Sequence, residues 1–471
     1  MFMLSSPISV LIVLLGAGAT PEAPVRLDVT VTVEGAGLPA DAPRSYPVRL
    51  VLGADRLAEE VAGVRYVLDF RARRRLVVDL AKKEYAEWSL YSVPLFRAME
   101  LGSRKALLAA FRGAGGRSMP DWPPALLHHE LAVSEPGTPT EIRREETSSR
   151  VLFRWKDRLL FEFDKEMARA SPRTLLVFSQ SFRYAHYGTH PEILGDLQAR
   201  PGIPKVLVHM AYPGGRATDP AVCTRYALDR ACVGDESSFL VAGLSRVQPN
   251  LGEEASLMEA ARKDPRGASA QVARASAGFD RASAAGRYFE ATLAATELFL
   301  QTEDPDWHRR VQSFADRARD DPSLRRLDAA LMPDQDHLAG AIRTLQSLRK
   351  ASGDFPHVLM IYEANLHARR RTGAGVERAF DDARRLHLAA LRVNPYNPSV
   401  WRDLGSTYQQ AFATEPAFFC WEFARELAPE HSASRHLDSL ERRLEADLPE
   451  FFLPGVGSPR GEAARAGGGG G

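Results

Sequence analysis

Residues 398–431 read PSVWRDLGSTYQQAFATEPAFFCWEFARELAPEH, and this stretch decides the fold of the carboxyl-terminal half of the chain. Trp401, Leu404 and Tyr408 recur at helical spacing, so they form one apolar face of a helix. A second helix follows after a turn at residues 414–416, and Pro429 stops it because proline cannot extend a helix. The two helices are predicted to pack through Trp401, Leu404, Gly405, Tyr408, Ala417, Trp421, Ala424 and Pro429.

The residue sizes and the 34-residue length of this unit resemble a tetratricopeptide repeat (TPR). Gly405 and Ala417 stand where that family needs small residues for close helix packing, whereas Trp421 is larger than the aromatic residue usual at its position. A generic helical hairpin with an accidental match is the alternative interpretation. Because one such unit cannot bury its apolar face alone, the resemblance implies a preceding repeat over residues 355–395 and a closing helix over residues 432–448.

The resemblance also implies a binding groove, because tetratricopeptide arrays bind extended peptides or partner helices on their concave face. The first helix of the clear repeat offers polar side chains there, exposed by the same periodicity that buries Trp401 and Tyr408. Among them, Arg402 is expected to hold a partner carboxylate through two hydrogen bonds. An ordinary solvated helix face is the alternative. The implied partner-binding residues are Ser399, Arg402, Ser406, Gln409 and Gln410.

The first residues differ from the rest of the chain. Residues 1–15 contain no charged side chain and end in an apolar run. Ala17 and Ala19 are small, as a cleavage site after residue 19 requires. The run is too short for a stable membrane anchor. We therefore predict a signal peptide over residues 1–19 and an exported protein, periplasmic or extracellular, with a membrane anchor or a buried strand as alternatives.

The first half of the chain alternates apolar and polar residues, the pattern of strands with one buried face. Helical segments are predicted over residues 94–112 and 191–198. Together these patterns predict an antiparallel sheet with one wet face, partly covered by helices. The predicted strands are residues 25–33, 48–52, 66–70, 76–80, 85–91, 126–133, 151–155, 159–163, 206–210 and 224–229.

A curved antiparallel sheet with helices, behind a signal peptide, is similar to the half-barrel of periplasmic lipoprotein carriers. The paired strands around Asp69 and Asp79, with Tyr85 in the next strand, carry this resemblance in architecture. It implies a concave face that can hold an acyl chain or an apolar peptide. An unclassified exported α+β domain is the alternative.

The predicted fold class is α+β multidomain, with an N-terminal curved antiparallel sheet and a C-terminal all-α TPR-like solenoid. The sheet domain covers residues 20–250. Residues 251–352 are rich in Ala, Arg, Asp and Glu at helical periodicity and are expected to form irregular helical hairpins. Residues 353–448 carry the repeats and their closing helix. Residues 449–471 are predicted to be disordered because their apolar content is low.

Charge content bears on the choice of partner, and cysteine content bears on a possible disulfide. Lys and Arg total 61 against 60 for Asp and Glu, so the net charge of +1 favours no nucleic-acid partner. The basic run at residues 71–75 is interpreted as a solvated turn, with a binding patch as the alternative. Cys223 and Cys232 are compatible with a disulfide across a loop or distorted hairpin, and a bridged and an unbridged pair both stay open. Cys420 is expected to be a buried apolar residue.

A search for catalytic motifs finds no nucleophile elbow, no phosphate-binding loop and no paired Cys-x-x-Cys motif in the sequence. The best candidates for metal ligands are the group His128, His129 and Glu130 and the pair His186 and His190, and surface or capping histidines are the favoured interpretation. Asp304 and Asp321, each followed by proline, are interpreted as helix caps. The acidic group to which they belong resembles a calcium site only in number: Glu303, Asp304, Asp306, Asp320 and Asp321. We therefore expect neither enzymatic activity nor a metal or other cofactor.

Two functions remain as hypotheses from the sequence. The first is a non-enzymatic exported scaffold of the bacterial envelope that binds a protein partner through the TPR-like helices. The alternative is a periplasmic carrier of a lipid or lipoprotein, in which the half-barrel holds an acyl chain and the repeats serve as a docking arm.

Overall fold

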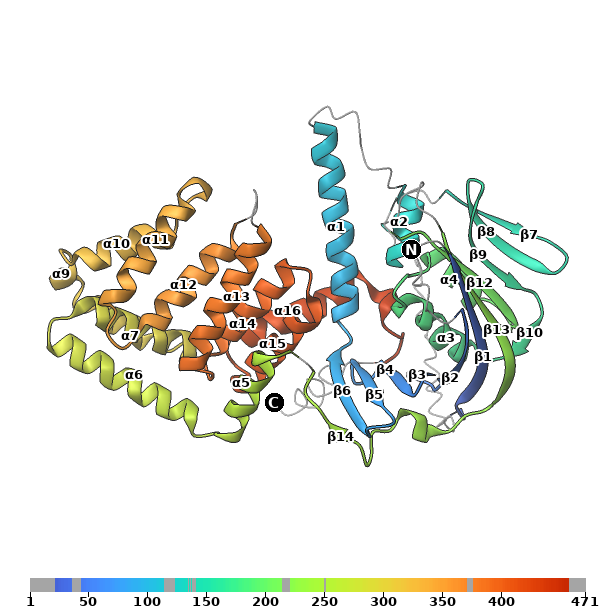
Figure 1. The fold of residues 1–471 in the computed structure, drawn as a ribbon, viewed down its shortest axis with the longest axis horizontal. Coiled ribbons are helices and arrows are strands. Elements are labelled where there is room, and N and C mark those ends of the chain that lie inside the picture. The colour runs from blue at the N-terminus through green and yellow to red at the C-terminus, as the bar shows by residue number, and fades with distance from the viewer. Residues whose placement is uncertain are drawn as a thin grey trace, which may run out of the picture.

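The computed structural model describes residues 22–35, 44–113, 123–133, 135, 137, 141–213, 221–249, 251–370 and 376–456. Within these ranges a sheet domain and a helical domain lie side by side, with α1 (Ser92–Gly113) standing between them (Figure 1). The predicted α+β class is confirmed. The predicted signal peptide at residues 1–19 lies outside the described residues.

The described part of the sheet domain is built on a 12-stranded sheet in the order β14-β6-β5-β4-β3-β2-β1-β13-β12-β9-β8-β7. Its neighbouring strands run antiparallel, apart from the parallel pair of β14 and β6. The strands are β1 (Val25–Gly35), β2 (Ser45–Leu52), β3 (Arg56–Val61), β4 (Val64–Asp69), β5 (Arg74–Asp79), β6 (Glu84–Ser89), β7 (Ile142–Glu146), β8 (Arg150–Trp155), β9 (Arg158–Asp164), β12 (Val206–Ala211), β13 (Val222–Val233) and β14 (Ser245–Arg246). The short strands β10 (Met167–Arg169) and β11 (Gly202–Pro204) pair separately.

Local sequence explains how these strands are connected. β3 and β4 are joined by Ala62 and Gly63, which both have positive φ, and Val61 pairs with Val64 across them. A two-residue turn of this kind matches the right-handed twist of its strands and favours glycine. β3 escaped the sequence analysis because Glu59 and Glu60 interrupt its alternation.

Three helices accompany the sheet: α2 (Pro124–Leu131), α3 (Pro172–Tyr184) and α4 (Pro191–Gln198). The strand predicted at residues 126–133 is wrong, because most of this segment is α2. Six of its eight residues are buried, so the segment carries no one-sided helical pattern to identify it. Ser171 accepts a hydrogen bond from the backbone of Thr174 and thereby caps α3, which packs against β2 and β3.

The described part of the helical domain contains α5 to α16. From α10 to α16 each helix packs against the next one in sequence, and α7 packs across α10, α12 and α14. The helices are α5 (Glu253–Lys263), α6 (Gly267–Ala284), α7 (Tyr288–Thr302), α8 (Asp306–Gln312), α9 (Ala315–Ala318), α10 (Pro322–Leu331), α11 (Leu338–Leu348), α12 (Pro356–Ala368), α13 (Val376–Val393), α14 (Pro398–Gln410), α15 (Thr414–Leu427) and α16 (Ser432–Asp447).

The helices α14 and α15 pack through their aromatic residues. Trp401 and Trp421 are fully buried, and the Trp421 Nε1 donates a hydrogen bond of 3.0 Å to the Arg402 carbonyl. A Cβ added to Gly405 would come 2.4 Å from the Trp421 Nε1, so the close approach depends on glycine there. The turn lies at residues 411–413, not at the predicted residues 414–416, because proline is tolerated in the first turn of α15.

The buried positions of this hairpin are Trp401, Leu404, Gly405, Ala417, Trp421 and Ala424, whereas Tyr408 is half-buried and Pro429 is exposed just beyond the end of α15.

A disulfide between Cys223 and Cys232 is wrong for this structure, in which both thiols are free. Both residues belong to the single strand β13, where they pair with Glu34 and Arg26 of β1. Nine residues of strand span roughly 30 Å, far beyond the reach of a disulfide. The predicted loop between them does not exist, whereas Cys420 is buried in α15 as expected.

The carboxyl-terminal segment at residues 449–456, here called the strap, is ordered and joins the two domains. Disorder from residue 449 onward was therefore a wrong prediction for this part, and residues 457–471 lie outside the described ranges. Phe451 and Phe452 enter an apolar cluster made by both domains, while Leu453 enters the core of the sheet domain. The low apolar content of the whole tail concealed these three consecutive apolar residues.

The basic run at residues 71–75 is not a solvated turn but a clamp between the domains. Its Arg73 pairs with Glu445 of α16 at 2.9 Å. Arg74 and Arg75 pair with Glu422 and Glu415 of α15. We call these three ion pairs the arginine clamp: Arg73 with Glu445, Arg74 with Glu422 and Arg75 with Glu415.

Candidate functional site

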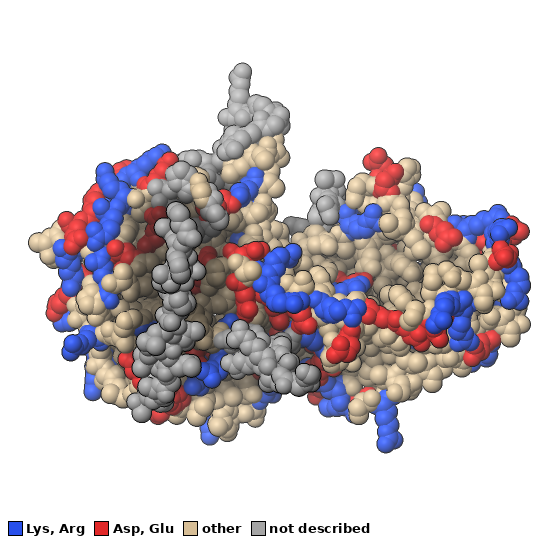
Figure 2. Space-filling view, turned by 180° about the vertical axis from the view of Figure 1, so that it is seen from behind, with Lys and Arg blue, Asp and Glu red and all other residues tan. Residues whose placement is uncertain are grey.

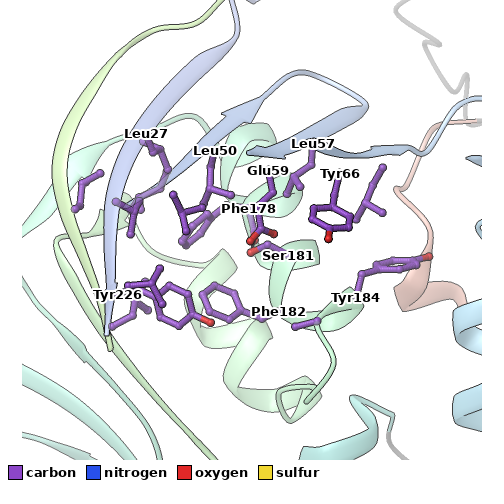
Figure 3. Close-up of a pocket in the computed structure, with 18 of the residues that line it drawn as sticks. Leu27, Leu50, Leu57, Glu59, Tyr66, Phe178, Ser181, Phe182, Tyr184 and Tyr226 are labelled. Carbon is purple, nitrogen blue, oxygen red and sulfur yellow. Dashed lines mark hydrogen bonds between the residues drawn. The ribbon is translucent and has the colours of Figure 1, made fainter. Parts of the chain in front are cut away.

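A cavity of about 580 Å³ lies between the concave face of the sheet and α3 (Figure 3). Alternate residues of the strands point into it, as the two-residue period of a strand requires. β1 supplies Leu27, Val29 and Val31, while α3 supplies Phe178 and Phe182 from the opposite wall. The cavity is therefore mostly apolar, and its strand wall is readable from the alternating sequence.

Polar groups in the cavity wall are few. Glu59 of β3 lines it together with Tyr66, Tyr226 and Ser181 (Figure 3), and Tyr46 also belongs to the wall. Burial raises the pKa of the Glu59 carboxyl. Burial also raises the pKa of the Tyr226 hydroxyl, and the nearby charge of Glu59 raises it further. The sequence analysis missed Glu59, although two successive glutamates in a strand require one of them to face inward.

The mouth of the cavity opens beside the helical domain. A second hollow of about 490 Å³ shares Arg75, Tyr184, Ala185 and His186 with the cavity. The turn between α14 and α15 forms part of its wall through Phe412 and Ala413. The Arg75 guanidinium at this junction pairs with Glu415. The two domains thus build the entrance together.

The predicted groove residues of α14 are only partly available. Ser399 is 4% exposed and is therefore not a groove residue, because it begins α14 beside the capping Asn397. The Arg402 guanidinium pairs at 2.7 Å with Asp403 of its own helix. The Ser406 hydroxyl donates to the Arg402 carbonyl at 3.1 Å. Gln409 is half-buried and Gln410 is exposed.

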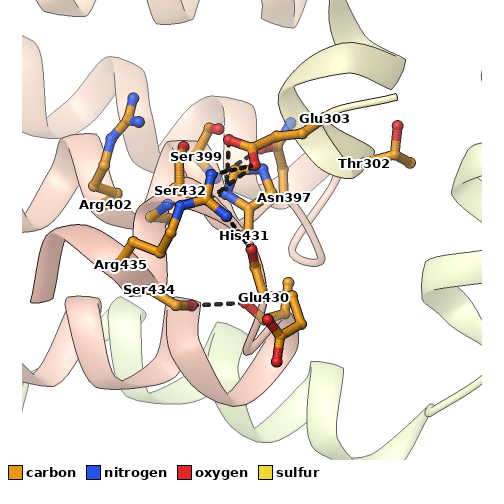
Figure 4. A network of polar contacts seen from close by, with 12 residues as sticks. Thr302, Glu303, Asn397, Ser399, Arg402, Glu430, His431, Ser432, Ser434 and Arg435 are labelled. Atoms are coloured by element: carbon orange, nitrogen blue, oxygen red, sulfur yellow. Dashed lines mark hydrogen bonds and ion pairs between the residues drawn. The ribbon is translucent and has the colours of Figure 1, made fainter. Parts of the chain in front are cut away.

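A polar network fixes the junction of α7 with α16 (Figure 4). Glu303 ends α7 in the left-handed region and accepts a 3.0 Å hydrogen bond from the backbone of Ser432. Its carboxylate also lies 3.3 Å from Arg435 and 3.6 Å from His431. Arg402 points away from this network (Figure 4). The network has a structural role, because it joins the two ends of neighbouring helices.

The other acidic candidates act as caps or exposed ion-pair partners. Asp321 accepts from the backbone of Ser323 and Leu324 at the start of α10, which confirms the capping interpretation. Asp304 accepts in the same way from Asp306 at the start of α8.

Three of the predicted histidine candidates lie together, because the His128 and His190 rings are 5.9 Å apart between centroids and His129 contacts the His190 backbone. His186 lines the cavity mouth, whereas His128 and His129 of α2 are buried, so a surface role is wrong for these two. His190 caps α4, as predicted. His209 of β12 lies beside His129, with ring centroids 5.2 Å apart.

Burial lowers the pKa of the His129, His190 and His209 imidazoles. It lowers the pKa of His209 to about 4. It also lowers the pKa of His190 to about 3, with a smaller contribution from nearby His128. The ring nitrogens of His129 contact the Met210 carbonyl at 3.0 Å and the His190 backbone amide at 3.1 Å. Within the described ranges no group of three or more His, Cys, Asp or Glu side chains is arranged to hold a metal ion.

Figure 2 shows acidic and basic side chains interspersed over the face that it presents. Of the helices that the structure describes, none is long and apolar enough to cross a membrane.

No protein-family model matches the chain, and no curated protein matches it. The cavity and its mouth are therefore the features from which a function can be inferred.

Proposed function

We propose that the sheet domain binds one apolar chain, such as the acyl chain of a lipid or lipoprotein, and that the protein is a non-enzymatic carrier. The observation that carries this proposal is the cavity of about 580 Å³. Pockets of about 300–1,000 Å³ with apolar walls and few polar groups are typical of small-molecule sites. An exported location, periplasmic or extracellular, belongs to the same proposal and rests on the composition of residues 1–19.

The helical domain has the role of a docking arm in this proposal. Its α14–α15 turn borders the hollow that adjoins the cavity, so a partner bound there would lie beside the entrance. The arginine clamp and the strap hold the arm against the sheet domain. Release or uptake of the apolar chain can therefore be coupled to a partner on the helical domain.

Filling the cavity tests the proposal. Ser181 lines the cavity, and its hydroxyl donates only to the Phe178 carbonyl of its own helix at 2.7 Å. Ser181→Trp should abolish binding of a neutral fluorescent alkyl-chain probe, because the indole occupies the space of the chain. Ser181→Ala is the matched control and should retain binding. Equal binding by both variants, with unchanged thermal unfolding, would rule out this cavity as the site.

A second candidate function is the binding of a protein partner along α14. It is favoured by the spacing of Arg402, Ser406 and Gln409, which recur on one side of the helix and stay partly exposed. Together with the exposed Gln410, this polar stripe is the part of the implied TPR groove that is accessible to a partner.

Charge reversal tests this second candidate. Arg402→Glu should weaken capture of a partner carboxylate, while unfolding free energy changes by no more than about 0.5 kcal/mol because the side chain is partly exposed. Arg385→Glu is the control, since Arg385 of α13 is also paired with an aspartate of its own helix but lies outside the predicted groove. Crosslinking to bound protein should fall in the first variant only; equal crosslinking in both would count against the groove.

A further inference from the structure

Glu59 places a carboxyl group in the wall of the cavity (Figure 3). It pairs in register with Leu50 of β2 and Tyr66 of β4, so all three side chains share the concave face. Within the described residues, no hydrogen-bond donor or cation contacts the Glu59 carboxyl. Glu59 is half-buried, and a ligand group of the right chemistry can gain free energy by pairing with its carboxyl on this mostly apolar wall.

Aromatic side chains surround the same part of the cavity. Tyr46, Tyr66 and Tyr226 line it with Glu59. The charge of Glu59 contributes to the raised pKa of the Tyr46 and Tyr226 hydroxyls, so both lie within its electrostatic reach. The negative faces of aromatic rings attract cations, and ammonium groups are often held by such rings together with a carboxylate. This part of the cavity is therefore suited to a positive charge.

The mouth of the cavity carries the opposite charge, but that charge is already neutralised. Arg75 lines the junction of the cavity and the outer hollow, where it pairs with Glu415 of α15. An anionic head group would have to compete with Glu415 for this guanidinium. A cationic group at Glu59 meets no such competitor, and the remaining wall of Leu27, Val29 and Leu228 accepts an alkyl chain.

We propose that the cavity selects an apolar chain bearing a protonated amine, with the ammonium group against Glu59 and the chain along the apolar strand wall. This inference rests on the proposed function and adds the chemical class of its ligand. The ammonium group donates charge-assisted hydrogen bonds to the Glu59 carboxylate. Among the described residues, Glu59 has no such partner.

Three probes of equal chain length separate the possibilities: dodecylamine, dodecanol and dodecanoate, each titrated calorimetrically into the full chain below its micelle-forming concentration. Dodecylamine should bind at least about tenfold more tightly than dodecanol, because a hydrogen bond to a charged group is stronger than one between neutral groups. Dodecanoate should bind more weakly than dodecanol. An equal or reversed order in the wild-type protein would overturn the proposal.

Two variants test whether Glu59 causes the preference for dodecylamine. Glu59→Gln keeps the size of the side chain and should remove the preference for dodecylamine while dodecanol still binds. Glu60→Gln is the matched control, because Glu60 follows in the same strand but pairs with Arg65 at 3.1 Å and Arg49 at 3.3 Å. It should leave the preference unchanged. A preference that survives Glu59→Gln would contradict the assignment of this residue.

The outcomes also separate this inference from the function on which it rests. Binding of all three probes without a preference for the amine refutes the ligand class alone. If none of the three probes binds, the cavity is not a carrier site and both proposals fail. Should Glu59→Gln not fold, as judged by thermal unfolding, the order of the probes in the wild-type protein still decides.

Discussion

At the scale of single residues, Gly405 shows how tightly the hairpin of α14 and α15 is packed. The Trp421 Nε1 would lie 2.4 Å from an added Cβ, and the Ala417 carbonyl oxygen would lie at 3.0 Å. Both neighbours belong to the buried side of α15. The helices therefore cannot keep their present separation if any larger residue replaces this glycine.

Gly405→Ala should lower the free energy of unfolding by about 1–3 kcal/mol, the usual cost of overpacking a core. Gly340→Ala provides the control, because Gly340 lies in α11 with open space around it. That change should be neutral or stabilise by up to about 1 kcal/mol, since alanine favours helix. Denaturant unfolding measures both changes. Equal effects would mean that the contact with Trp421 leaves room for a Cβ at position 405.

The buried histidines make stability depend on pH. Burial lowers the pKa of His190 to about 3 and of His209 to about 4, against 6.5 for an exposed imidazole. The unfolded chain therefore binds more protons than the folded protein below about pH 6.5. Their contribution to stability is fully present above that pH and is lost as the pH falls toward 4 and then 3.

As the pH falls through this window, each such histidine should lower the free energy of unfolding by about 1.4 kcal/mol per pH unit. His209→Gln should reduce the slope of unfolding free energy against pH by about this amount between pH 6 and pH 4.5. Denaturant unfolding at a series of pH values measures the slope. The same slope in the variant would show that His209 is protonated in the folded protein.

Sequence reasoning at the residue scale worked where a residue has a local role. The buried Trp401 follows from helical spacing, and the cap at Asp321 follows from the proline after it. The prediction that Ser399 faces the groove failed because the exposure of its side chain depends on packing around the start of α14, which spacing alone does not reveal. The inward-facing Glu59 could have been found from the paired glutamates of β3. That its carboxyl has no partner among the described residues could not.

At the scale of elements, strands with one apolar face were predictable and fully buried elements were not. β1 alternates over its whole length and was identified from the sequence. α2 was mistaken for a strand because nearly all its residues are buried. The strap was missed because residues 449–456 are too few to form a periodic pattern, although Phe451 and Phe452 are buried.

Truncating the strap's main aromatic anchor tests its role. Phe451 is fully buried, packs edge-on to Tyr184 at 5.7 Å and stacks beneath Arg183. Phe451→Ala should therefore destabilise the protein by about 3–5 kcal/mol. Glu450→Ala is the control and should change stability by no more than about 0.5 kcal/mol, because the Glu450 carbonyl that accepts from Gln180 remains. Similar stabilities of the two variants would show that the strap does not hold the domains together.

At the scale of the whole molecule, the two halves of the chain form one continuous structure. Tyr91 and Leu127 from the sheet domain share an apolar cluster with Phe418 and Leu440 from the helical domain. The arginine clamp adds ion pairs between residues more than 300 positions apart in the sequence. No local pattern could have predicted these partners, so the basic run at residues 71–75 was misread as a solvated turn.

The position of the cavity relative to the two domains suits the proposed carrier. The cavity lies in the sheet domain, while part of its entrance is built by the α14–α15 turn of the helical domain. The clamp and the strap hold together the two domains that line the hollow adjoining the cavity. The class of fold was predictable from alternation and helical spacing, whereas the shared entrance appears only in three dimensions.

Native mass spectrometry of the chain, purified without detergent, tests the central claim most directly. The wild-type protein and Ser181→Ala should each carry one apolar-chain molecule, released on denaturation, whereas Ser181→Trp should carry none. Wild-type protein that retains no such molecule, and takes none up from added lipid, would contradict the account.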